Sequence, residues 1–168
     1  LLQRSLRDNV RTTGSSSVQS GAAHLTLGQA LVGGGDVETG LDHLRRGHAA
    51  FRASLGADHP FTAAAAGLVG WGAMHAGALD TASVRLADSI RRQRAGLPTT
   101  ARRLGRTLTD AAELRLRLGD HAGAERRLVE ADSLLGVSGT SSTAWQRARI
   151  HSLRAECETL SRIGDLRA

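Results

Sequence analysis

The sequence predicts an all-α protein in which antiparallel helix hairpins stack into a superhelical array. Three observations lead to this fold class. The 168-residue chain is rich in Leu, Ala and Arg but has only two Pro and 2% aromatic residues, which favours helices over β-sheets. Glycines at the ends of helical segments recur every 42 residues, at Gly35, Gly77 and Gly119. On both sides of each glycine, apolar or small residues recur at intervals of three and four, which is the helical period.

Further positions share this spacing, so each hairpin is predicted to be a copy of one unit. A small residue lies seven positions before each turn glycine, another lies five positions after it, and a Leu lies nine positions after it. These positions are Gly28, Gly40 and Leu44; Gly70, Ala82 and Leu86; and Ala112, Ala124 and Leu128. Because helices cross closely only where side chains are small, we expect the two small residues of each unit to face each other. A hairpin alone buries one face, so neighbours must stack to complete a core.

The predicted elements follow in order. Residues 1–13 are expected to form the second helix of a preceding repeat, because their apolar residues continue the helical period. Full repeats are predicted over residues 18–56, 61–96 and 100–136, and a partial repeat, after a three-residue insertion, over 143–168. Asp58 is expected to cap the helix that begins near Pro60. Both ends fall within such a pattern, so we expect a piece of a longer protein.

These offsets resemble the tetratricopeptide repeat, which has small residues at positions 8 and 20 and a large apolar residue at position 24. The 42-residue spacing, with Leu55-Gly56-Ala57-Asp58-His59-Pro60, resembles the longer kinesin-light-chain-like variant found in bacterial signalling proteins. At position 4, where the family has a bulky residue, this chain has His24, Ala66 and Leu108. The resemblance implies a right-handed α-solenoid whose first helices line a concave groove. It implies a non-enzymatic scaffold that binds a partner protein or peptide, for example as the regulatory tail of a kinase or transcription regulator.

The resemblance also assigns residues to the groove. The candidates on the inward face of the first helices are Gln29, Trp71, His75, Arg106, Glu113, Arg117, Arg154 and Glu158. The chain has no Lys, so the Lys/Asn clamp with which some members of the family hold a terminal carboxylate is absent. Arg106, Arg117 and Arg154 could hold carboxylates or phosphates instead, and Trp71 could be an exposed platform. The alternatives are a packed Trp and solvated Arg side chains.

The charge leaves a second function open. All 22 basic residues are Arg, against 16 acidic residues, which gives a net charge of +6. An Arg-rich helical module that binds nucleic acid is therefore the alternative. However, most arginines lie among acidic residues, and few aromatic rings are present to stack on bases. We expect a protein partner, with self-association as a further outcome if apolar faces at either end of the array are open.

The sequence predicts neither a catalytic site nor a metal or other cofactor. The seven His include no pair four residues apart with an adjacent Glu, the arrangement of helical zinc proteases. Cys157, the one cysteine, excludes an internal disulfide and lies at a small-residue position, where we expect it to be buried. Residues 61–79 lack Asp, Glu, Lys and Arg, but they are mostly Ala and Gly. We expect a helix packed on two sides there rather than a membrane span, and a cytoplasmic protein.

Overall fold

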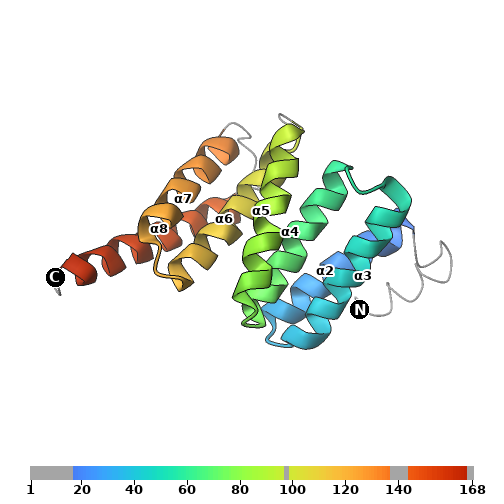
Figure 1. Cartoon of the computed structure of the whole chain (residues 1–168), viewed down its shortest axis with the longest axis horizontal. Helices are drawn as coiled ribbons and strands as arrows, with labels where there is room; N and C mark the ends of the chain where they lie inside the picture. The colour runs from blue at the N-terminus through green and yellow to red at the C-terminus, as the bar shows by residue number, and fades with distance from the viewer. Residues whose placement is uncertain (1–16, 97–98, 137–143, 166–168) are drawn as a thin grey trace. The chain divides into compact units, whose positions relative to one another are not determined.

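The computed structural model describes residues 17–96, 99–136 and 144–165, and within these ranges it contains helices and no strands. In chain order the helices are α2 (Val18–Gly33), α3 (Val37–Leu55), α4 (Pro60–His75), α5 (Leu79–Ala95), α6 (Ala101–Arg117), α7 (His121–Gly136) and α8 (Ala144–Asp165) (Figure 1). The all-α prediction is confirmed for this part of the chain. The helix predicted over residues 1–13, and residues 166–168 of the last predicted repeat, lie outside the described residues.

Contacts divide the chain within α5 into two units, Leu1–Arg92 and Gln93–Ala168. In the first unit α3 packs against α2 and α4, and α2 also touches α4. Its core includes Leu25, Leu44, Phe51 and Val69. In the second unit α7 packs against α6 and α8, and α6 also touches α8 (Figure 1). Neighbouring helices therefore bury each other's apolar faces in both units.

The turns between paired helices are closed in the same way at intervals of 42 residues. Gly35, Gly77 and Gly119 all have a positive φ, between 77° and 92°, which residues with a Cβ rarely adopt. The residue after each glycine donates its backbone N–H, over 2.9 Å, to the carbonyl five residues earlier: Asp36 to Leu31, Ala78 to Ala73 and Asp120 to Arg115. The described helices thus have a repeat-like architecture, and in each hairpin glycine supplies the conformation that reverses the chain.

The small residues of the first hairpin lie where its helices approach each other closely. A Cβ added to Gly28 would lie 2.8 Å from the carbonyl oxygen of Gly40, closer than side chains tolerate. At Gly70 the nearest atoms belong to Leu86 and Arg85. The remaining repeat positions on both sides of the turns are almost fully buried: Ala82, Ala112, Ala124, Leu44, Leu86 and Leu128.

The start of α4 differs from the prediction. His59, not Asp58, is the N-cap residue, and its Nδ1 accepts a hydrogen bond of 3.2 Å from the backbone N–H of Phe61. The reason is that Pro60 occupies the first helical position, for which its fixed φ is suited, so the cap falls on the residue directly before it. The Asp58 side chain is fully exposed instead.

α4, like α2, contains no Asp, Glu, Lys or Arg, and most of its residues are buried. It packs against α2 and α3, and the hydroxyl of Ser89 on α5 donates a 2.7 Å hydrogen bond to the Ala63 carbonyl. Ala and Gly suit α4 because other helices pack closely against it on more than one side, where larger side chains would not fit. No helix in the described part of the chain has both the length and the apolar character that a membrane crossing requires.

Candidate functional site

The face shared by α6 and α8 brings several charged side chains together. Two contacts define it: Arg106 lies over the ring of Trp145, and Arg149 binds Asp110. Both pairs are 39 residues apart, so the two helices run parallel in constant register. Along α6, Arg106, Asp110, Glu113 and Arg117 follow at intervals of four, three and four, which places them on one stripe. Three of the predicted groove residues, Arg106, Glu113 and Arg117, therefore share this face.

Arg149 is the centre of an ion-pair network on this face. Its Nη1 donates to Asp110 Oδ1 at 2.7 Å, and its Nη2 donates to Glu113 Oε2. Glu113 also accepts a hydrogen bond from Arg117 at 2.8 Å. The Asp110 side chain is only 2% exposed, whereas that of Arg149 is 26% exposed. The network thus links α8 to the interior of the hairpin formed by α6 and α7.

Burial and charge act in opposite directions on the two carboxyl groups. Burial raises the pKa of Asp110, although Arg149 and Arg106 act to lower it. Burial also acts to raise the pKa of Glu113, but hydrogen bonds and charges from Arg149 and Arg117 outweigh it, so the pKa of Glu113 is lowered. Burial acts to lower the pKa of Arg149, and the two carboxylates reverse this and raise it. Arg149 is therefore held in its charged form by its partners.

Arg106 and Trp145 lie beyond the network, near the start of both helices. The Arg106 guanidinium carbon lies 5.7 Å from the centre of the Trp145 ring, within range of a cation–π contact. Trp145 is 52% exposed, and Arg106 is half-buried. Trp145, Asp110 and Arg149 were not among the residues predicted from the sequence. Because an insertion precedes α8, the 42-residue spacing could not align Trp145 and Arg149 with α6. Asp110 could have been predicted, since it lies four residues after Arg106 and three before Glu113, on the same face of α6.

The groove candidates of the first unit lie in ordinary packing contacts. Gln29 donates its side-chain amide to the Leu25 carbonyl at 3.0 Å, within its own helix. Trp71 is half-buried and packs against the hydrophobic core. The ring of His75 meets that of Trp71 edge-on, with 4.9 Å between the ring centres. These contacts bring Trp71 and His75 together on α4.

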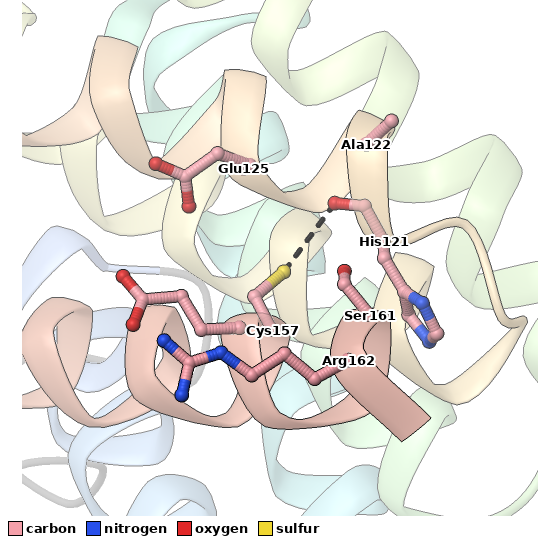
Figure 2. A pocket seen from close by; sticks show the side chains of 7 residues that line it. His121, Ala122, Glu125, Cys157, Ser161 and Arg162 are labelled. Carbon is pink, nitrogen blue, oxygen red and sulfur yellow. Dashed lines mark hydrogen bonds between the residues drawn. The ribbon is translucent and has the colours of Figure 1, made fainter. Parts of the chain in front are cut away.

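The last two candidates lie toward the far end of α8. Arg154 pairs with Glu125 of α7 at 2.8 Å, so it faces α7. Glu158 lines a cavity of about 500 Å³ together with Cys157, Arg162, Ser161 and the first turns of α7. Figure 2 shows Glu125 and Ala122 on one side of this cavity and Cys157, Ser161 and Arg162 on the other. Cys157 is buried, as predicted, and its Sγ–H donates to the His121 carbonyl at 3.3 Å.

Comparisons with known proteins add no family assignment. No protein-family model matches this sequence, and neither does any curated protein. In the described residues, no group of three or more His, Cys, Asp or Glu side chains is arranged to hold a metal ion. The geometry of the α6–α8 face is therefore the principal basis for a functional interpretation.

Proposed function

We propose that this chain is an interaction module of the tetratricopeptide type, a solenoid of helix hairpins that binds a partner protein or peptide. The 42-residue recurrence of turn hydrogen bonds, positive-φ glycines and buried small residues supports this proposal. We place the binding site on the part of the α6–α8 face formed by Arg106 and Trp145, and we call it the Arg106–Trp145 face. The ion-pair network around Arg149, one turn further along both helices, holds them in register.

The observation that carries this assignment is an exposed Trp covered by an Arg. Trp and Arg, together with Tyr, are enriched among the residues that dominate binding energy at protein interfaces. Among the described residues, Arg106 is in no ion pair, and its Nε is buried without a hydrogen-bond partner. An apolar partner side chain would pack on the exposed part of the indole, and a neighbouring carboxylate or phosphate would bind the guanidinium.

The charge distribution favours an acidic partner segment. Residues 101–109, the first half of α6, contain three arginines and no acidic residue, and the helix N-terminus adds positive potential. Many arginines of the described residues pair with Asp or Glu: Arg46, Arg91, Arg92, Arg94, Arg115, Arg117, Arg147, Arg149 and Arg154. Dispersed and paired arginines of this kind suit a protein partner better than a continuous nucleic-acid backbone.

Fluorescence tests the proposal directly. The chain has two Trp, so a Trp71→Phe background makes Trp145 the sole indole. The probes are short synthetic peptides in which Glu or phosphoserine adjoins Leu, with Lys-substituted peptides as negatives. We expect the acidic peptides to change Trp145 emission, and Arg106→Glu to weaken binding by about tenfold or more. Exposed Arg126, on α7, supplies the matched control Arg126→Glu, which should bind as the background does.

Two results would contradict this assignment. Peptide affinity that is unchanged in Arg106→Glu, and also in Trp145→Ala when a dye-labelled peptide replaces the lost indole as reporter, would show that this face does not bind the peptides. A DNA or RNA oligonucleotide that binds more tightly than every peptide, with an affinity that falls steeply with salt, would establish the nucleic-acid alternative.

A further inference from the structure

Two histidines of the first unit, His24 and His43, face each other between α2 and α3. The Nδ1 atoms of His24 and His43 are 2.8 Å apart, and the ring centres are 5.0 Å apart. His24 is buried, with 8% exposure, and His43 is half-buried. A neutral imidazole carries one N–H, so a hydrogen bond between two Nδ1 atoms requires one Nδ1–H ring and one Nε2–H ring. A single proton therefore lies between the two nitrogens.

The equivalent positions of the other hairpins show that packing does not require this pair. Residues 42 and 84 positions after His24 are Ala66 and Leu108, both buried and apolar. The residues equivalent to His43 are Arg85 and Arg127. A buried polar ring costs stability unless it is hydrogen-bonded, so burial of His24 requires the hydrogen bond from His43. The apolar residues at the equivalent positions need no such partner.

Few other charges surround the pair. On α3, Asp42 and Arg46 are near, and they bind each other at 2.8 Å. α2 has no other charged or titratable residue, and the one titratable side chain of α4 is His75. Burial, then His43 and Arg46, lower the pKa of His24, and Asp42 opposes them. Burial and Arg46 likewise lower the pKa of His43, so both rings are neutral near pH 7.

We propose that His24 and His43 form an acid-sensitive latch between α2 and α3, which accepts one extra proton but not two. The first proton binds the free Nε2 of the Nδ1–H ring and leaves the hydrogen bond in place. A second proton would put two N–H groups and two positive charges face to face across 2.8 Å, so the rings must separate. Because the folded pKa values lie below 6.5, the latch is intact above pH 6.5 and weakens as the pH falls below it.

NMR of the wild-type protein gives the first test. Imidazole ¹⁵N chemical shifts near about pH 7.5 distinguish the two tautomers. We expect one ring to be Nδ1–H and the other Nε2–H. Two Nε2–H rings, or two rings that titrate near pH 6.5 as free histidines do, would overturn the proposal. This measurement needs no variant, so it remains decisive even if a substitution prevents folding.

A double-mutant cycle gives the second test. His24→Leu introduces the residue that the third hairpin has at the equivalent position, Leu108, and His43→Gln keeps a polar side chain. The two substitutions are made separately and in combination. Urea unfolding is measured at about pH 7.5 and about pH 5. For each proton that the unfolded state binds and the folded state does not, the equilibrium constant for unfolding rises by up to about tenfold as the pH falls by one unit. At the higher pH we expect a favourable coupling free energy between the two histidines. At the lower pH this coupling should be lost or become unfavourable.

His48 supplies the matched control for this cycle. It lies on α3, and burial, followed by Arg85, lowers its pKa too. His48→Gln should therefore reduce acid sensitivity on its own but should show no coupling to His24→Leu. Coupling between His24 and His43 that is absent, or equal at both pH values, would overturn the proposal.

Discussion

Removal of the charge of Arg149 tests how strongly the α6–α8 face depends on its ion pairs. Arg149→Met keeps the apolar stem but leaves the almost fully buried Asp110 without its closest counter-charge. Loss of one partner of a buried pair typically costs about 3–5 kcal/mol. Because 26% of the Arg149 side chain is exposed, water screens part of this interaction, and we expect a cost near the lower end, about 3 kcal/mol.

Urea denaturation measures this cost, with a surface pair as the control. Arg46 and Asp42 form an ion pair at 2.8 Å whose side chains are 63% and 51% exposed, so Arg46→Met should cost at most about 0.5 kcal/mol. Asp110→Asn combined with Arg149→Met removes the unpaired charge and should be more stable than Arg149→Met alone. If Arg149→Met lowers the free energy of unfolding by no more than Arg46→Met does, the buried network does not stabilise the fold and this reasoning is refuted.

The pH dependence of the Arg149→Met variant gives a second check. Arg149 acts to lower the pKa of Asp110, so the variant raises a folded-state pKa that burial already holds above its ordinary value. The folded variant then binds a proton that the unfolded chain has released, and its stability falls as the pH rises through that interval. The deficit relative to wild type should therefore shrink on acidification. A deficit that grows as the pH falls would contradict this sign.

The remaining predictions concern the small residues and the thiol. Gly28→Ala should lower the free energy of unfolding by about 1–2 kcal/mol, because its Cβ would lie 2.8 Å from the Gly40 carbonyl and the helix-propensity gain offsets only part of the strain. The Cβ of Gly33→Ala would meet nothing within 4 Å, so this variant should be neutral or more stable by about 0.5 kcal/mol; urea denaturation measures both variants. Cys157, 4% exposed and with its pKa raised mainly by burial, should react with a thiol reagent at neutral pH far more slowly in the folded than in the urea-unfolded protein.

For the part of the chain that the structure describes, the sequence was sufficient to predict helices and the turns between paired helices, because these depend on local chemistry. A glycine at a positive φ ends a helix whatever surrounds it, and Gly35, Gly77 and Gly119 all do so. The error at the start of α4 is of a different kind. Asp58 and His59 can both accept a capping hydrogen bond, and only the position of Pro60 as the first helical residue decides between them.

The charged face was harder to predict because its contacts join residues far apart in sequence. The resemblance assigned Arg106, Glu113 and Arg117 to one face, but it gave no partner for them within the chain. Arg149 and Trp145 follow an insertion that breaks the 42-residue register, so their alignment with α6 required the packing of α8. Whether Arg149 binds Asp110 or solvent is decided by that packing and not by local propensity.

Equivalent positions with different residues connect the two proposals. The turn glycines and the small residues at the helix crossings must recur, because each hairpin needs the same reversal and the same close approach. The other positions are free to vary. At two of them His24 stands where the other hairpins have an apolar residue, and the half-buried Arg106 adds a charge beside Trp145. In a repeat protein, recurrence therefore marks the scaffold. Binding and regulation are to be sought where one hairpin departs from its neighbours.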